Sequence, residues 1–218
     1  MQPLRCSTLG RDAYTAVRAV LLDGVTFAPG AKISVEDMAR RLGVSRSPLW
    51  AAIARLEAEG IVDVVPRQGV FLSRCDPMKL TALFEAREAL EGMAARLAAG
   101  RRDESHLASM AAAVTEQQGC ARRGERGGYH HAARAFHEVV SRAAASPEID
   151  RLLSGLYGRG QAMCSRLPPP PDRWAGACAD HAALLEALHQ RDGDAAERIA
   201  RAHVHRLAQA ALDALVPA

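Results

Sequence analysis

The chain has 218 residues, of which 49% are hydrophobic and only 4% aromatic, so an aliphatic core and a mostly helical fold are expected. A formal net charge of +3 argues against a polycation that binds nucleic acids without specificity. The N-terminus lacks a signal-peptide pattern, and no apolar run approaches the roughly 18 residues of a spanning helix. We therefore expect a soluble cytoplasmic protein with no membrane partner.

The cysteines also favour a reducing compartment. They are odd in number, widely separated and never spaced as Cys-x-x-Cys, which argues against a disulfide framework or a zinc knuckle. The five are Cys6, Cys75, Cys120, Cys164 and Cys178.

The first 60 residues contain three short helical patterns. Apolar residues recur at helical spacing over residues 11–23, before Gly24 breaks the pattern. Ser34 and Asp37 form an approximate capping box that opens a second helix, and this helix ends at Gly43. Two helices joined by a tight glycine turn predict a helix-turn-helix.

The third helix is expected to begin after a Ser45 cap and to have two distinct faces. Its apolar positions face the core, and its remaining positions face outwards. The apolar face holds Leu49, Ile53 and Leu56, and the outer face holds Arg46, Ser47, Trp50 and Ala54.

Two strand patterns follow this helix. The runs "IVDVV" and "GVFLS" are separated by Pro66-Arg67-Gln68-Gly69, which predicts a β-hairpin. The helices and this hairpin together predict a winged helix-turn-helix DNA-binding domain over residues 1–75.

Residues 76–218 carry no strand signal and predict an all-α bundle. Its breaks are Gly100, "GERGG" at 124–128, Pro147, "LPPPPD" at 167–172 and Asp192-Gly193-Asp194. We interpret "RRGERGG" as a mobile basic loop. The six predicted helices are 77–99, 103–118, 129–145, 147–163, 176–191 and 194–214.

A recognition helix meets base edges with its first turns. Arg46 can pair bidentately with guanine, and Ser47 with the helix N-terminal amides can hold a phosphate. The alternative is that these side chains are only solvated. The residues expected to contact DNA are Arg40, Ser45, Arg46, Ser47, Trp50, Arg67, Gln68 and Gly69, with Arg41 able to flank the backbone.

The stretch "SVEDMARRLGVSRSPLWAAIARLEAEGIVDVVPRQGVFLS" resembles the winged helix of GntR-family bacterial transcription regulators. The resemblance implies that Arg46 reads a base. The family has arginine where this chain has Trp50, and indole has one N–H donor and no charge, so Trp50 cannot copy arginine's two bonds to guanine. We expect Trp50 either to contact a thymine methyl or to pack back on the domain, and we favour packing because an exposed ring is costly.

Three histidines of the bundle lie on apolar faces. His181 and His203 are placed almost symmetrically about the Asp192-Gly193-Asp194 turn, so an antiparallel helix pair brings them to one level. His137, beside Phe136, is a third candidate. A single histidine of this kind is more often a hydrogen-bonded core residue, but three that converge predict a Zn²⁺ or Ni²⁺ site with open coordination positions.

"AARAFHEVV" and "DHAALLEALHQRDGDAAERIARAHVH" resemble the FCD ligand-binding domain of the FadR-type GntR branch. That resemblance implies an aspartate and three histidines around a metal, above an organic-acid pocket. The aspartate position, four residues before His137, is Ala133 here, and His130 lies too far along the helix to replace it. The loss predicts a weaker metal site, or a cavity that holds an organic anion without metal.

Arg87 lies on an inward seam and is a second candidate for binding effector carboxylates, as the FCD resemblance implies for an arginine near this place. Glu91, four residues later, offers the alternative of an intrahelical salt bridge. The effector candidates are thus Arg87, His137, His181 and His203.

The sequence predicts a ligand-responsive repressor, not an enzyme, that binds a pseudo-palindromic operator as a homodimer and responds to a small organic acid. One alternative is a metal-dependent enzyme, but "HEVVS" lacks the second histidine of a zinc-protease helix, and no carboxylate is evident beside the open site. The other alternative is a DNA-binding dimer without an effector.

Overall fold

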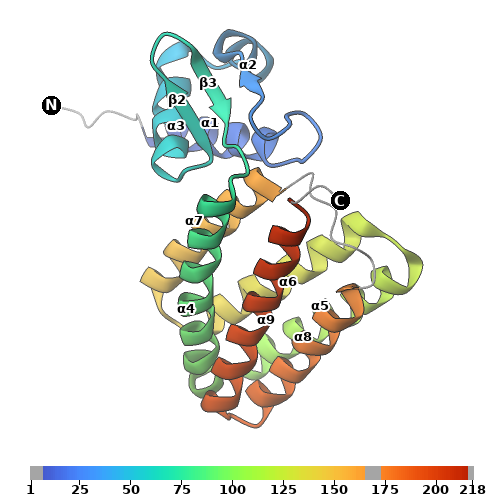
Figure 1. The fold of residues 1–218 in the computed structure, drawn as a ribbon. Coiled ribbons are helices and arrows are strands. Elements are labelled where there is room, and N and C mark those ends of the chain that lie inside the picture. Colours follow the sequence, from blue (N-terminus) through green and yellow to red (C-terminus); the bar gives the residue numbers. More distant parts are fainter. Residues whose placement is uncertain (1–6, 165–172, 216–218) are drawn as a thin grey trace, which may run out of the picture. The chain divides into compact units, whose positions relative to one another are not determined.

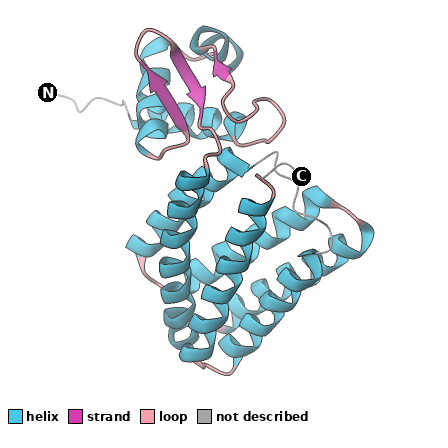
Figure 2. Ribbon diagram, in the orientation of Figure 1, coloured by secondary structure: helices cyan, strands magenta, loops and turns pink. Residues whose placement is uncertain are grey.

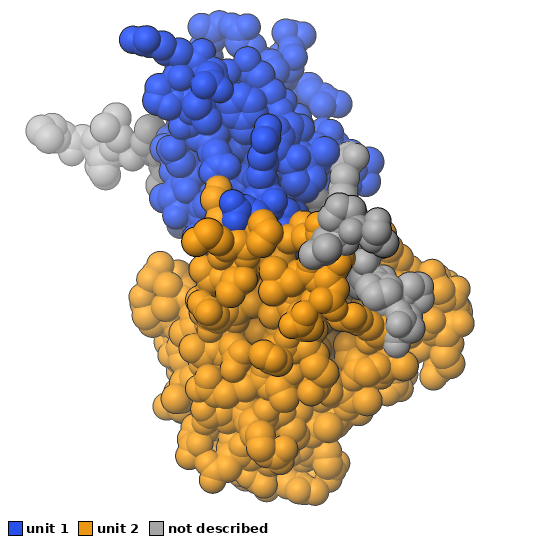
Figure 3. Space-filling model, viewed as in Figure 1, with its two compact units in different colours: residues 1–76, 155–166 blue, residues 77–154, 167–218 orange. Residues whose placement is uncertain are grey.

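The computed structural model describes residues 7–164 and 173–215 and is mostly helical with one small sheet (Figures 1 and 2). The chain divides into two compact units, coloured separately in Figure 3. The first unit comprises residues 1–76 and 155–166, and the second comprises residues 77–154 and 167–218. Residues 155–166, which the sequence assigned to the second domain, thus pack with the first unit.

The first unit begins with three helices, α1 (Ser7–Leu21), α2 (Val35–Leu42) and α3 (Arg46–Ala58). The Ser34 side chain accepts a hydrogen bond from the amide of Asp37, which is the first half of the predicted capping box. Gly43 ends α2 with φ at 64°, a left-handed conformation that glycine adopts without strain. The predicted helix-turn-helix is therefore present.

The wing is a three-stranded antiparallel sheet in the order β1-β3-β2. Its strands are β1 (Lys32–Ile33), β2 (Val62–Val65) and β3 (Gly69–Leu72). The predicted hairpin is β2 and β3, whereas β1 was not predicted. A two-residue strand is too short to show the alternation by which strands are identified.

The C-terminal half of α7 (Pro147–Cys164) completes the first unit. Ala162 is buried in the same aliphatic cluster as α1 and α3. Arg159 donates from Nε to the backbone oxygen of Glu59 at 3.0 Å, at the end of α3. Gln161 donates to the backbone oxygen of Leu22, just after α1. These bonds satisfy carbonyls that helix ends leave open.

The second unit is built from helices, as predicted (Figure 1). Helix α4 runs along α9, and α5 runs beside α6 and α8. Apolar side chains from α4, α5, α6, α8 and α9 share one core around Met110, Phe136 and Leu188. The helices are α4 (Pro77–Arg101), α5 (Glu104–Arg123), α6 (Arg126–Ala143), the first half of α7, α8 (Trp174–His189) and α9 (Gly193–Asp213).

The connection between α5 and α6 corrects the expectation of a mobile basic loop. Gly124 and Glu125 alone separate the two helices, and Gly127 and Gly128 lie inside α6. Arg123 pairs with Glu125 at 2.8 Å, so its charge is compensated locally. The proline run at 167–172 lies outside the described residues.

Among the described helices, none combines the length and hydropathy that crossing a membrane requires.

Candidate functional site

The outer face of α3 is exposed, as the sequence predicts. Leu49 and Leu56 are fully buried in the core of the first unit. Arg46, Ser47 and Trp50 point away from that core and are exposed. The helix thus presents a polar first turn and one indole ring to solvent.

Trp50 is 46% exposed, which contradicts the interpretation that its ring packs back on the domain. The reason is its place on the helix. Leu49 and Ile53 fill the inner face, and Trp50 follows Leu49 by about 100°, so its ring is turned outwards with Arg46. An exposed ring of this size is a candidate contact surface.

The charged side chains near this face have acidic partners. Arg46 pairs with Glu36, and Arg40 pairs with Asp37 at 2.8 Å; all four side chains are more than half exposed. Exposed pairs of this kind contribute about 0–1 kcal/mol, so a phosphate can displace the carboxylate. Ser45 is the N-cap residue of α3, as predicted, but its side chain makes no cap hydrogen bond.

The wing tip carries Arg67 and Gln68, both exposed. The backbone turns there with φ at 64° for Arg67 and 120° for Gly69, and the amide of Gln68 donates to the oxygen of Val65 at 3.0 Å. Arg41 is exposed on α2.

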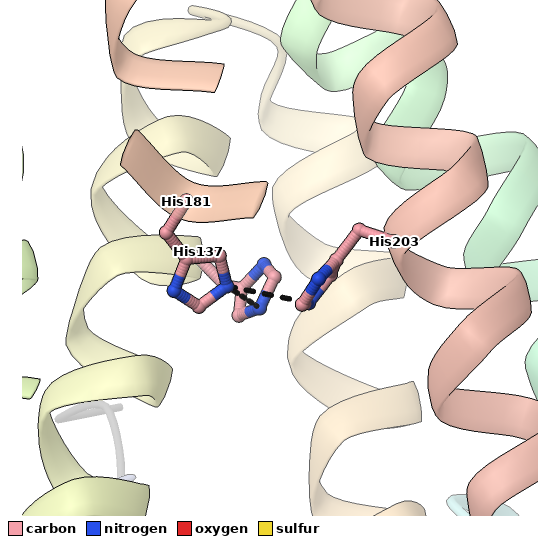
Figure 4. A group of neighbouring side chains, drawn as sticks. All are labelled: His137, His181 and His203. Carbon is pink, nitrogen blue, oxygen red and sulfur yellow. Dashed lines mark hydrogen bonds between the residues drawn. The ribbon is translucent and has the colours of Figure 1, made fainter. Parts of the chain in front are cut away.

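In the second unit, His137 from α6, His181 from α8 and His203 from α9 point toward one another (Figure 4). The Nε2 atom of His181 lies 3.2 Å from the Nε2 atoms of both His137 and His203. His181 and His203 are 1% and 3% exposed, so their rings are largely shielded from water. We call these three residues the histidine triad.

The α8–α9 hairpin explains how the triad forms. Arg191 adopts φ of 60° in the turn, and Asp192 caps α9 by accepting from the amide of Ala195. The two helices then run antiparallel, and residues equally far from the turn meet. The predicted meeting of His181 and His203 is confirmed.

Each triad residue has a hydrogen-bond partner at its other ring nitrogen. Two partners are carboxylates, which the sequence analysis did not foresee beside this site. They come from different helices than the imidazoles they contact, so sequence spacing does not reveal them. Glu91 Oε2 lies 3.1 Å from His137 Nδ1, Asp180 Oδ2 lies 3.1 Å from His203 Nδ1, and Gln117 Oε1 lies 2.7 Å from His181 Nδ1.

Both carboxylates are held in the ionised form. Burial favours the neutral acid of Glu91, but Arg87 and His137 lower its pKa to about 2. Burial likewise opposes ionisation of Asp180, yet hydrogen bonds from His203 and Arg206 lower its pKa. An ionised carboxylate only accepts hydrogen bonds, so the Nδ1 atoms of His137 and His203 carry hydrogen and donate. In the neutral rings, their Nε2 atoms are bare lone pairs.

Burial also favours the neutral form of two of the imidazoles, those of His181 and His203. It lowers the pKa of His181 well below its usual value, and the neighbouring His137 and His203 act in the same direction. Burial lowers the pKa of His203 as well, although Asp180 opposes the shift. Neutral imidazoles are the form that binds Zn²⁺ or Ni²⁺.

Two of the separations within the triad fit ligands of one metal ion. Two imidazole nitrogens bound at about 2.0–2.1 Å, with angles between octahedral and tetrahedral, are about 2.8–3.4 Å apart. The Nε2 separations of 3.2 Å from His181 to His137 and to His203 lie within this range, and all three ligand atoms lie within 4.8 Å of one another. A metal-binding histidine usually donates from its other ring nitrogen to a carboxylate or carbonyl, as His137 and His203 do from Nδ1.

Arg87 is largely buried, and its Nε donates to Glu91 at 2.8 Å. The predicted intrahelical salt bridge is therefore present. Glu91 links Arg87 to the triad, since its other oxygen faces His137. Ala133 offers no ligand atom, and His130 packs near the Tyr129 and Trp174 rings instead of joining the triad.

Models of two known families match this chain. The first, "Bacterial regulatory proteins, gntR family", matches residues 9–72, and the second, "FCD domain", matches residues 82–206, more than half of the chain. The chain belongs to the GntR family and carries an FCD domain. The family that matches residues 9–72 is one of bacterial regulatory proteins, and the relatives that match are transcriptional regulators or repressors.

Individual relatives agree with this assignment. An uncharacterized HTH-type transcriptional regulator of Agrobacterium vitis is 37% identical over 91 residues, covering 41% of this chain and 53% of that protein. The chain thus spans about half the length of this relative. The galactonate operon transcriptional repressor of Escherichia coli is 29% identical over 170 residues, covering 75% of this chain and 71% of the repressor. The solved structure of E. coli McbR/YncC has a TM-score of 0.81 at 20% identity and covers 92% and 95% of the two chains, which shows the same fold.

Proposed function

We propose that this protein is a transcriptional repressor that binds operator DNA as a homodimer. Its affinity for DNA changes when a small organic acid binds at a metal ion that the histidine triad holds. The proposal places the protein in the bacterial cytoplasm. The observation that supports it most directly is the convergence of three Nε2 atoms, each on a ring whose Nδ1 is hydrogen-bonded.

The DNA-binding half of the proposal rests on the outer face of α3. Arg46 in the first turn can exchange Glu36 for a guanine edge or a phosphate. The exposed ring of Trp50 is suited to the methyl group of thymine and not to guanine. Arg67 and Gln68 at the wing tip can contact a neighbouring phosphate or the minor groove. Ser47, Arg40 and Gly69 can add contacts to the phosphate backbone of the DNA.

The proposed metal site is supported by the distribution of charge around the histidine triad. Two bare Nε2 lone pairs, on His137 and His203, face His181 inside a buried site. A cation bound by these lone pairs would remove the electrostatic repulsion between them. Glu91 and Asp180 compensate its charge from outside the ligand shell, which offsets the loss of the aspartate at Ala133.

A bound Zn²⁺ or Ni²⁺ would supply open coordination positions and positive charge for a carboxylate. The chain would supply three nitrogen ligands and, at Arg87, a guanidinium close to the triad through Glu91. Small organic acids are therefore the expected effector class. If the acid binds one arrangement of the dimer more tightly than another, it shifts the dimer toward that arrangement. The affinity for the operator then changes by up to the ratio of the acid's affinities for the two arrangements.

The test is operator binding in the presence of candidate acids. A preferred DNA site is first selected from random sequences, and its affinity is then measured with a panel of small organic acids, in Zn²⁺ or Ni²⁺ and in chelator. We expect one acid class to change the affinity only when metal is present. A change that persists in chelator would indicate an anion pocket formed by the histidines and Arg87. If no acid changes the affinity, the sensor role is wrong.

A further inference from the structure

Gln117 differs in kind from the two carboxylates that contact the histidine triad. It is fully buried on α5, and its Oε1 lies 2.7 Å from His181 Nδ1. Its Nε2 is also buried and has no hydrogen-bond partner among the described residues. A buried N–H group without a partner is costly, so this orientation of the amide needs compensation from elsewhere.

His181 can carry its ring hydrogen on either nitrogen, and its neighbours decide which. The carboxylates of Glu91 and Asp180 leave bare Nε2 atoms on His137 and His203, both 3.2 Å from His181 Nε2. Without a cation, His181 relieves this meeting of lone pairs by carrying hydrogen on Nε2 and donating it to one neighbour. With a metal ion bound, His181 Nε2 is a ligand, and the hydrogen is on Nδ1.

The two states of His181 need opposite partners at Nδ1. The metal-bound state needs an acceptor there, and the metal-free state needs a donor. A carboxylate serves only the first and an ammonium only the second, whereas an amide serves both by a half-turn of its terminal torsion.

We propose that Gln117 is a positioning residue whose amide turns with the metal state of the triad and sets which nitrogen of His181 carries hydrogen. This inference rests on the proposed metal site. In the metal-bound state, Oε1 accepts from Nδ1 of His181; in the metal-free state, Nε2 of Gln117 donates to that same atom. As the metal leaves, His181 takes up a proton at Nε2 and releases the proton at Nδ1 to solvent, so its charge is unchanged.

The test uses the full-length protein labelled with ¹⁵N-histidine, with Zn²⁺ and with chelator. Long-range ¹H–¹⁵N spectra report which ring nitrogen of His181 carries hydrogen, with the signals assigned by comparison with His181→Asn. We expect Nδ1–H with Zn²⁺ and Nε2–H in chelator. In parallel, competition titrations compare the Zn²⁺ affinity of Gln117→Glu and Gln117→Met with the wild type.

The carboxylate of Gln117→Glu serves only the metal-bound state, so Zn²⁺ affinity should rise about tenfold or more, and in Gln117→Met it should fall by a similar factor. Gln118→Glu adds the same charge one residue further on α5 and should leave the affinity within about twofold. Unchanged affinity in Gln117→Glu, or Nδ1–H on His181 in both conditions, overturns this inference alone. Absence of Zn²⁺ binding by the wild type overturns the proposed metal site as well.

Discussion

His181 and His203 are 22 residues apart in the chain, yet their Nε2 atoms lie 3.2 Å apart in the second unit. The helical hairpin of α8 and α9 produces this contact, and α6 adds His137 from a third direction. Three imidazoles at this separation, two of them buried, have few stable arrangements, and one of these is a shared cation.

Replacing Glu91 by alanine should destabilise the second unit strongly. The variant leaves the largely buried Arg87 without its carboxylate and His137 without its acceptor. We expect a loss of about 3–5 kcal/mol in the free energy of unfolding, measured by denaturant titration in chelator. Glu88→Ala, on the same helix with a more exposed side chain, should cost much less. Equal losses for the two variants would contradict the buried role of Glu91.

The same carboxylate gives a prediction for pH. The folded-state pKa of Glu91 is about 2, below its ordinary value of 4.5. A depressed folded pKa adds stability that is present above pH 4.5 and lost as pH falls toward 2. Wild type should therefore lose its stability advantage over Glu91→Gln progressively as pH falls from about 5 toward 2 in chelator. A stability difference that stays constant over this range would show that the ionised form is not the stabilising one.

Much of this arrangement was predictable from the sequence, because local patterns encode it. The helices from α4 to α9 begin and end within three residues of the predicted bounds, because breaks such as the Asp192 turn have local steric causes. The exception is α5, which runs to Arg123, five residues past its predicted end at 118. The meeting of His181 and His203 followed from counting residues on either side of one turn.

Features that depend on contacts between distant residues were not predictable. Asp180 contacts His203 across a helix hairpin, and Gln117 reaches His181 from α5, so neither has a local signal. The exposure of Trp50 was misjudged because the general cost of an exposed ring was given more weight than its place on the helix. The assignment of residues 155–166 to the first unit depends on tertiary bonds such as the one from Arg159 to Glu59.

Arg159→Ala tests that packing. The side chain donates a charge-assisted bond to the end of α3 and lies against Gly60. Its loss should destabilise the first unit by about 1.5–3 kcal/mol, measured from the unfolding transition of Trp50 fluorescence with Trp174→Phe in the background. Arg151→Ala, which removes an exposed pair with Glu148 near the start of the same helix, should leave that transition in place. Equal stabilities of the first unit in Arg159→Ala and Arg151→Ala would contradict a stabilising role for the contact between Arg159 and the end of α3.

Two substitutions on α3 test the DNA-binding face. Arg46→Ala should weaken binding to the selected operator by about 1–3 kcal/mol and relax base preference at one position.

Trp50→Arg should gain a guanine preference at the position that the wild type reads with its ring. Arg55→Ala, whose guanidinium lies over Tyr14 on another face of α3, is the control and should keep the wild-type preference. Unaltered site selection by both variants would show that this face does not read bases.

The most direct test of the account is metal binding by the triad. Zn²⁺ or Ni²⁺ is titrated into metal-free full-length protein by calorimetry, with His203→Gln as the ligand variant and His205→Gln as its control. His205 lies two residues further on α9 with a side chain that is 75% exposed, so its loss changes the histidine count but not the triad. We expect one ion per chain for the wild type and for His205→Gln, and greatly weakened binding for His203→Gln. Equal binding by the two variants, or none by the wild type, would contradict a metal centre at His137, His181 and His203.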